Sequence, residues 1–131
     1  MVKKIVFDNE LIAIIVTSDY QKDGISFFTP DDFSQQLAFM KHTKGHIIQP
    51  HIHNICERHV NYTQEVLVIK KGKLRVDFYD KNKIYKESYI LQEGDVILLA
   101  SGGHGFEVLE DIEMFEIKQG PYAGEKDKTR F

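Results

Sequence analysis

Short runs of apolar residues, separated by turn-forming residues, make up most of the chain. The clearest run covers residues 73–79, where Leu74, Val76 and Phe78 alternate with charged residues. Because successive side chains of a strand point to opposite faces of a sheet, this alternation predicts a strand that is buried on one face. Similar runs predict further strands at residues 4–7, 11–17, 25–28, 35–42, 65–70, 84–91, 96–99, 104–109 and 112–118.

Turn residues lie between these runs, such as Asp8-Asn9 between the first two and Lys71-Gly72 before residues 73–79. No stretch of ten or more residues repeats apolar positions at the spacing of a helix face, so we expect no long helix. About ten short strands at short intervals predict an all-β sandwich or barrel.

The apolar composition points the same way. Ile and Val together number 24, whereas Leu and Ala together number 12. The side chains of Ile and Val are branched at Cβ and pack well on a pleated surface. The 131 residues are enough for one core, and no repeat or linker divides them, so we expect a single domain.

Charge and composition exclude several classes of function. The net charge of −3 offers no surplus of cations for nucleic acid. The apolar run at residues 11–16 is far shorter than the roughly 20 residues that a membrane-spanning helix needs, and no signal peptide is evident. Cys56 is the only cysteine and can form no disulfide within the chain, which favours a cytoplasmic location.

The strongest chemical feature is the sequence His51-Ile52-His53. In a strand, both imidazoles would project from one face, together with Gln49. Two convergent imidazoles form half of a typical metal site, but they can equally be a surface pair or a hydrogen-bonded structural pair.

Two more residues extend this pattern. Glu65 begins an apolar run, at a position that would share a strand face with Leu67 and Ile69. His104 follows a Gly-Gly turn. A carboxylate on an apolar face is costly to bury unless it is paired or bound to a metal. Three imidazoles and one carboxylate together provide a mixed nitrogen and oxygen site with room for water or substrate.

These residues and the glycines around them resemble the two signature motifs of the cupin superfamily. The matching positions are Gly45, His51, His53, Glu65 and Gly72 for the first motif and Gly94, Asp95, Gly102, Gly103 and His104 for the second. The resemblance covers residues 34–118, which leaves N-terminal strands in 1–33 and a charged tail in 119–131. It implies a double-stranded β-helix, the jelly-roll barrel of cupins.

The resemblance also implies a metal centre. Carried over position by position, its ligands would be His51, His53, Glu65 and His104. Imidazole and carboxylate ligands suit one divalent transition metal, namely Fe, Mn, Ni or Zn. The absence of thiolates argues against a closed structural zinc site.

The chain departs from the family pattern at one important place. Eleven residues separate His53 from Glu65, where the family has a much shorter gap. Glu57 stands at the short spacing and is the competing ligand. Glu65 is preferred because it leads into a strand, whereas Glu57 leads into polar loop.

Substrate recognition is assigned to this long loop and to the end of the chain, because loops on rigid scaffolds often carry binding groups. The alternative is that both segments are merely solvated. Cys56, in the same loop, has no evident activating partner and is read as an inert thiol. The candidate substrate-binding residues are Arg58, Tyr62, Gln64, Lys118 and Tyr122.

Three functions follow from these features. The first is a metal-dependent isomerase or dioxygenase that acts on a small polar, carbohydrate-type metabolite, with Glu65 as ligand or base. The second is a non-catalytic module that binds a metal or small molecule. The third is a metal-free epimerase with a histidine base and a tyrosine acid.

We also expect a homodimer. The N-terminal runs at residues 4–7 and 11–17 carry more apolar side chains than a lone hairpin can hide. Because an exposed apolar edge invites pairing, these strands are the expected two-fold interface.

Overall fold

The computed structural model describes residues 1–131 and is all-β, which confirms that part of the prediction. Eight strands are formed: β1 (Val2–Phe7), β2 (Glu10–Val16), β3 (Gly24–Phe27), β4 (Ala38–Lys41), β5 (Glu65–Tyr79), β6 (Tyr85–Gln92), β7 (Val96–Leu99) and β8 (Gly103–Lys118). The one helical element is a 3₁₀ turn, η1 (Gly124–Asp127). No helix has the length and apolar character needed to cross a bilayer.

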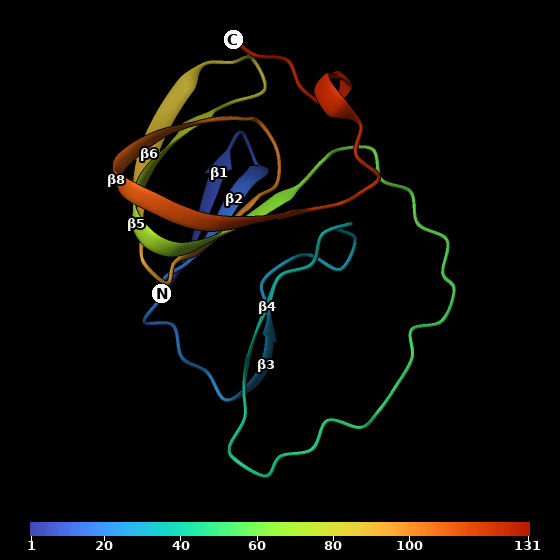
Figure 1. Ribbon diagram of the computed structural model, residues 1–131. Helices are drawn as coiled ribbons and strands as arrows, with labels where there is room; N and C mark the ends of the chain where they lie inside the picture. Colours follow the sequence, from blue (N-terminus) through green and yellow to red (C-terminus); the bar gives the residue numbers. More distant parts are fainter.

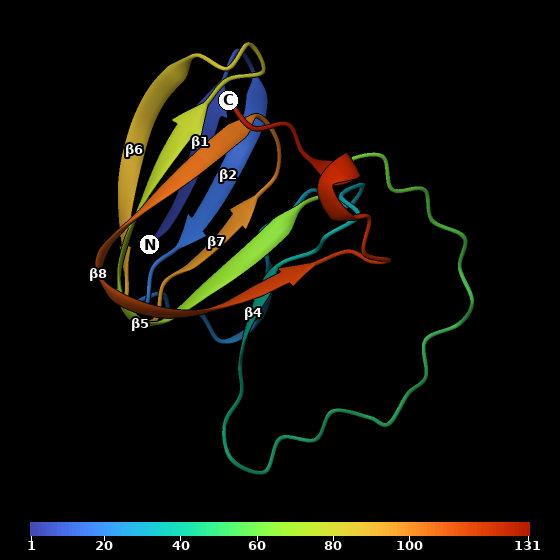
Figure 2. The same ribbon diagram turned by 45° about the horizontal axis from the view of Figure 1, so that its top comes forward.

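The strands form a curled antiparallel sheet that resembles half of a barrel (Figure 1). Its order is β1-β2-β7-β5-β6, and β8 pairs with β5. β5 is the central strand, because β7 and then β6 pair along one of its edges while β8 follows the other. β8 bends almost into a ring in Figures 1 and 2, and β3 and β4 form a separate two-stranded sheet.

The turn predicted at Lys71-Gly72 is a bulge instead. The sequence predicts separate strands at 65–70 and 73–79, but β5 runs through both without a break. Gly72 adopts a φ of 91°, and the pairing of β5 with β8 shifts register on both sides of it. The prediction of a hairpin turn was wrong because both halves of β5 pair with the same neighbour, so the glycine bends the strand rather than reversing it. β8 likewise joins the runs predicted at 104–109 and 112–118.

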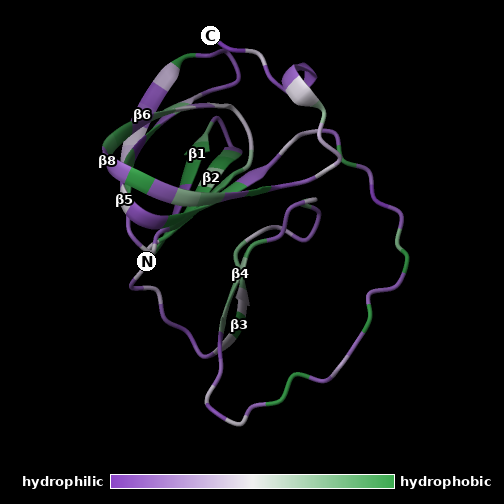
Figure 3. Cartoon of the chain, in the orientation of Figure 1, coloured by the Kyte–Doolittle hydropathy of each residue, from purple (hydrophilic) through white to green (hydrophobic).

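The core lies on the concave side of the curled sheet. Leu74, Val76 and Phe78 are completely buried there, as their alternation predicts, and Leu67 and Ile69 lie in the same cluster. β2, β6 and β7 supply most of the remaining side chains, among them Ile12, Ala13, Ile15, Leu91, Ile97 and Leu99. In Figure 3 β2 is mainly hydrophobic in colour, whereas β8 alternates between hydrophobic and hydrophilic colours.

The segment between β4 and β5 differs most from the expected barrel. Residues 42–62, which we call the arch, form no strand and are exposed throughout. Both ribbon views show the arch as a wide loop directed away from the curled sheet (Figures 1 and 2). The strand predicted at 35–42 is reduced to the four residues of β4.

The apolar residues of β2 are covered within one copy of the chain. Ile12 through Val16 are buried, because Ile12, Ala13 and Ile15 pack in one apolar cluster and Ile14 and Val16 in a second. The apolar run at 11–17 therefore has an explanation that needs no second copy. The homodimer itself stays a prediction.

Candidate functional site

The ends of β5 and β8 bring three chemically active side chains together. Glu65 begins β5 and pairs in register with Lys118, which ends β8. His104 lies at the opposite end of β8, where it pairs with Phe78. Because the two strands curl, His104 nevertheless approaches Glu65, with 3.5 Å between Nε2 and Oε2. Lys118 Nζ lies 3.9 Å from the other carboxylate oxygen of Glu65.

Burial makes this Glu65–His104–Lys118 cluster more than a surface ion pair. The side chain of Glu65 is 14% exposed, that of Lys118 27% and that of His104 30%. Glu65 lies on the face of Leu67 and Ile69, which are both in the core. The carboxylate thus has the apolar surroundings that its position two residues before Leu67 predicts. His104 and Lys118 supply the charged partners that a buried carboxylate requires.

The cluster keeps Glu65 ionised. A hydrogen bond from His104 lowers the pKa of Glu65 below its ordinary value, and burial opposes this effect only in part. The charges of His104 and Lys118 lower the same pKa further. At neutral pH the site therefore contains a carboxylate that orients an imidazole.

We predict a pH-dependent contribution of Glu65 to stability. Because its folded pKa is depressed, the contribution is fully present above its unfolded pKa of about 4.5 and is lost as the pH falls through the lower folded value. Glu65→Gln should cost about 1 kcal/mol of unfolding free energy at pH 7. Urea titrations at pH 7 and at pH 3 should show the difference from wild type shrinking in acid.

Glu57→Gln is the control, because Glu57 is fully solvated in the arch and contacts only His59. It should leave the unfolding free energy unchanged at both pH values. A cost for Glu65→Gln that is equally large at pH 3 would show that the carboxylate charge is not the cause.

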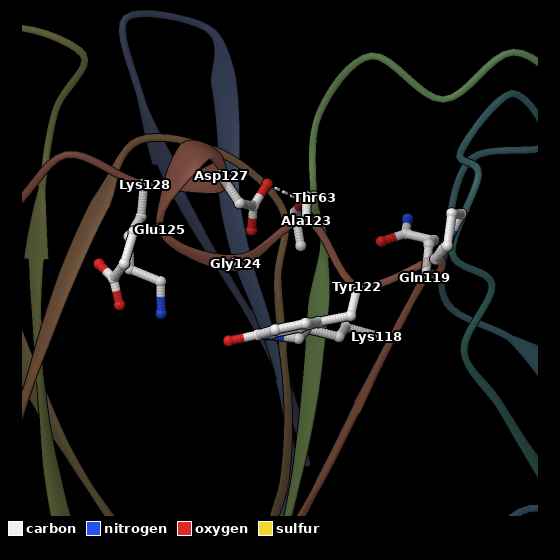
Figure 4. Close-up of a pocket in the computed structure, with 10 residues that line it drawn as sticks. Thr63, Lys118, Gln119, Tyr122, Ala123, Gly124, Glu125, Asp127 and Lys128 are labelled. Atoms are coloured by element: carbon white, nitrogen blue, oxygen red, sulfur yellow. Dashed lines mark hydrogen bonds between the residues drawn. The ribbon is translucent and has the colours of Figure 1, made fainter.

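A polar pocket lies beside the cluster and shares Lys118 with it. Its cavity volume is about 50 Å³, and it is partly open to solvent. Figure 4 shows Lys118, Gln119 and Tyr122 on one side and Glu125 and Lys128 on the other. The pocket therefore offers cations, carboxylates, an amide and a phenol to a small polar molecule.

The C-terminal residues form the wall of this pocket rather than a free tail. Gln119 accepts a hydrogen bond from the backbone N–H of Gln64 at 3.0 Å and donates one to Ser34 at 2.8 Å. The hydroxyl of Thr63 donates to Asp127, the dashed line in Figure 4. The last residue, Phe131, packs edge-on against the ring of Tyr79.

The structure distributes the predicted substrate-binding residues over different places. Lys118 and Tyr122 line the pocket. Gln64 is buried, and its side-chain oxygen accepts a hydrogen bond from the backbone of Gln35, so it holds two loops together. Arg58 and Tyr62 lie in the exposed arch and do not line the pocket.

The predicted metal cofactor is wrong. No group of three or more His, Cys, Asp or Glu side chains in the structure could hold a metal ion. His51 and His53 contact each other edge to face in the exposed arch, while Glu65 and His104 pair in the barrel. Glu57 offers no alternative, since its neighbour is His59 of the same arch.

The physical reason is the missing strand. The two imidazoles would share a face with the barrel interior only if residues 49–53 ran as a strand within it. They form none, and His51 Nδ1 instead hydrogen-bonds the carbonyl oxygen of Gln49 at 2.8 Å. Of the eleven residues between His53 and Glu65, the first nine are thus exposed chain, and only Thr63 and Gln64 are anchored, to the C-terminal segment.

The sequence reading missed a second polar network, on the convex face of β5 and β6. Arg75 binds Asp77 through two nitrogens, at 2.8 and 3.0 Å, and Asp77 also accepts a hydrogen bond from Ser88. Tyr85 and Glu107 complete the network. Arg75 and Asp77 stand two residues apart in a strand, which is the signal for a same-face pair. The polar groups of this network are hydrogen-bonded or ion-paired with one another, so we interpret the network as stabilising the sheet.

The Glu65–His104–Lys118 cluster with its pocket is the candidate site. Comparison with family models, with curated proteins and with solved structures gives no match.

Proposed function

We propose that this protein is a metal-independent acid–base enzyme, an isomerase or epimerase that acts on a small polar, carbohydrate-type metabolite. The observation that carries the proposal is the sparsely exposed Glu65–His104 pair, with Lys118 shared between it and a polar pocket. A cupin-like jelly-roll barrel and a cytoplasmic location belong to the same proposal. The motif spacing and the curl of the sheet support the first, and the single cysteine supports the second.

His104 is the base in this proposal. Its Nε2 faces the carboxylate of Glu65, and its Nδ1 has no hydrogen-bond partner in the chain. A carboxylate that accepts the Nε2–H bond fixes the tautomer in which Nδ1 carries the lone pair. Nδ1 of His104 is therefore free to take a proton from a carbon next to a substrate carbonyl.

Lys118 and Tyr122 complete the reaction. Proton removal places negative charge on the carbonyl oxygen, and the ammonium of Lys118 stabilises that charge. Tyr122 lines the same pocket and gives a proton back to the neighbouring carbon or to the opposite face. Exchange with water then returns a proton to Tyr122 and removes one from His104. No electrons enter or leave, so the product is an isomer of the substrate. A dioxygenase reaction would need the assembled set of metal ligands that the chain lacks.

The test is solvent deuterium exchange. Wild-type protein, incubated in D₂O with a panel of aldoses, ketoses and their phosphates and with a chelator present, should place deuterium at the carbon next to the carbonyl. NMR spectroscopy follows the signal loss. His104→Gln should lower the exchange rate by about 10² to 10⁴-fold.

His59→Gln is the matched control, because this histidine lies in the exposed arch beside Glu57. It should exchange deuterium at the wild-type rate. Binding of a panel member without exchange would replace the enzyme by a binding module. Exchange that occurs only when a metal is added would contradict the proposal.

A further inference from the structure

The arch and β8 together expose an unusual amount of apolar surface. Of the 23 large hydrophobic residues that are exposed, six lie in the arch and six on β8. They are Ile47, Ile48, Ile52, Ile55, Val60 and Tyr62 in the arch and Phe106, Val108, Leu109, Met114, Phe115 and Ile117 on β8. Figure 3 shows hydrophobic stretches along the arch, although it contacts no sheet. Apolar surface gathered in this way marks an interaction site.

β8 also has an unused edge. It is the longest strand, with 16 residues, and it pairs only with β5. Its other edge therefore presents a row of backbone N–H and C=O groups that can pair with another strand. The remaining edge strands, β1 and β6, are shorter, and the exposed apolar residues of β1 are Val2 and Val6.

The arch has the composition of a strand that lacks a partner. Residues 46–56 are rich in Ile and His and carry no carboxylate. In an extended conformation Ile48 and Ile52 would lie on one face, and His51 and His53 on the other together with Ile47 and Ile55, so both faces would carry apolar side chains. Pro50 is compatible with an added strand, because a strand at the edge of a sheet leaves half of its N–H groups free.

The charges of the two segments are complementary. β8 carries five carboxylates and one lysine, whereas the arch carries Lys44 and Arg58 against one carboxylate, Glu57. Three of the β8 carboxylates form ion pairs with β5, but their side chains are more than half exposed and can still face a second cation. Opposite charges steer the two segments together and set their register.

The occupant of β8 is a second copy rather than the arch of the same chain. The C-terminal end of the arch is fixed to the tail by the bonds of Thr63 and Gln64. Both ribbon views show that the arch leaves this point away from β8 and ends at β4, in the separate sheet (Figures 1 and 2). The arch of a neighbouring molecule is under no such restraint.

We propose that the arch of each copy adds as a strand to the free edge of β8 in the other copy, so that the reciprocal exchange forms a two-fold symmetric dimer. The added strand places alternate side chains on the face of β8 that bears His104 and Lys118. The dimer thereby covers the open side of the half-barrel, and a partner's arch borders the candidate site. This inference does not depend on the proposed function.

The experiment combines mass measurement with cross-linking. Light scattering at 100 µM should give twice the chain mass of 15.2 kDa. Ile52→Asp/Ile55→Asp should weaken the dimer at least about a hundred-fold, because each change occurs in both symmetric contacts. Ile84→Asp, at an exposed turn outside both segments, should leave the mass unchanged. Circular dichroism should show the same sheet in all three proteins, since Ile52 and Ile55 touch no core residue.

Cys56, the only cysteine, lies in the arch and allows a photo-cross-linker to be attached there. In a mixture of ¹⁴N and ¹⁵N protein, cross-links to residues 103–118 should join light chains to heavy chains. A monomer at 100 µM would overturn the proposal. So would cross-links confined to one copy, which would show that the arch closes its own barrel, or a dimer that persists in the Ile52→Asp/Ile55→Asp variant.

Discussion

Gly72→Ala should cost at least about 3 kcal/mol of unfolding free energy, enough to unfold much of a marginally stable domain. Gly72 has a φ of 91°, which a residue with a side chain adopts only with strain. An added Cβ would also lie 2.1 Å from the carbonyl oxygen of Asp111 on β8. The obstacle is backbone, so relief requires β8 to move away from β5 at the point where both strands bulge.

Gly105→Ala is the control for this substitution. Gly105 lies on β8, the partner strand of β5, and pairs with Asp77, but a Cβ there would meet only the ring of Tyr79, at 3.9 Å. The φ of Gly105 lies outside the left-handed region. Gly105→Ala should therefore change the unfolding free energy by less than about 1 kcal/mol. Urea denaturation of both variants measures the difference. Equal stability of Gly72→Ala and wild type would refute the bulge geometry.

Gly72 also illustrates how far local sequence determines structure. Its neighbours and its conformation mark an irregularity in the strand, and the irregularity is present as a bulge. Whether a glycine with positive φ reverses the chain or bends it depends on which strand pairs with each half. Here the partner is β8, more than thirty residues away, and nothing near Lys71-Gly72 specifies that pairing.

The spacing of two residues predicted shared faces correctly where the segment forms a strand, and wrongly where the segment forms none. Leu74, Val76 and Phe78 are buried because β5 has neighbours on both edges. His51 and His53 have the same spacing of two, but the arch has no neighbour that would hold it extended. Side chains at every second position share a face only if the segment is extended, and hydrogen bonds to a neighbouring strand are what hold it extended.

The candidate site was predictable in part for the same reason. The cost of a carboxylate on the apolar face of Leu67 and Ile69 required a partner for Glu65, and the structure supplies His104 and Lys118. The curl that brings the two ends of β8 to one carboxylate is a property of the whole sheet. No spacing within residues 103–118 indicates that their ends lie close together.

Asp95→Ala should lower the unfolding free energy by about 2 to 4 kcal/mol at pH 7, because it leaves two backbone donors without an acceptor. Asp95 is 2% exposed. One carboxylate oxygen accepts the N–H of Ser18 and the other accepts the N–H of Gln92, each at 2.9 Å. The side chain thereby joins the residues that follow β2 to the turn between β6 and β7.

The backbone of Asp95 strengthens this junction. Its carbonyl oxygen accepts a hydrogen bond from Ile69 at 2.9 Å, and the N–H of Gly94 donates to the carbonyl of Ile69 at 2.8 Å. These bonds hold the turn against β5. Asp95→Asn keeps one oxygen acceptor and should lose about half as much. Glu93→Ala, at the exposed neighbouring position, should stay within about 0.5 kcal/mol of wild type in the same urea titration. If Asp95→Ala is as mild as Glu93→Ala, the Gly94-Asp95 turn does not brace the sheet, and its place in the motif needs another explanation.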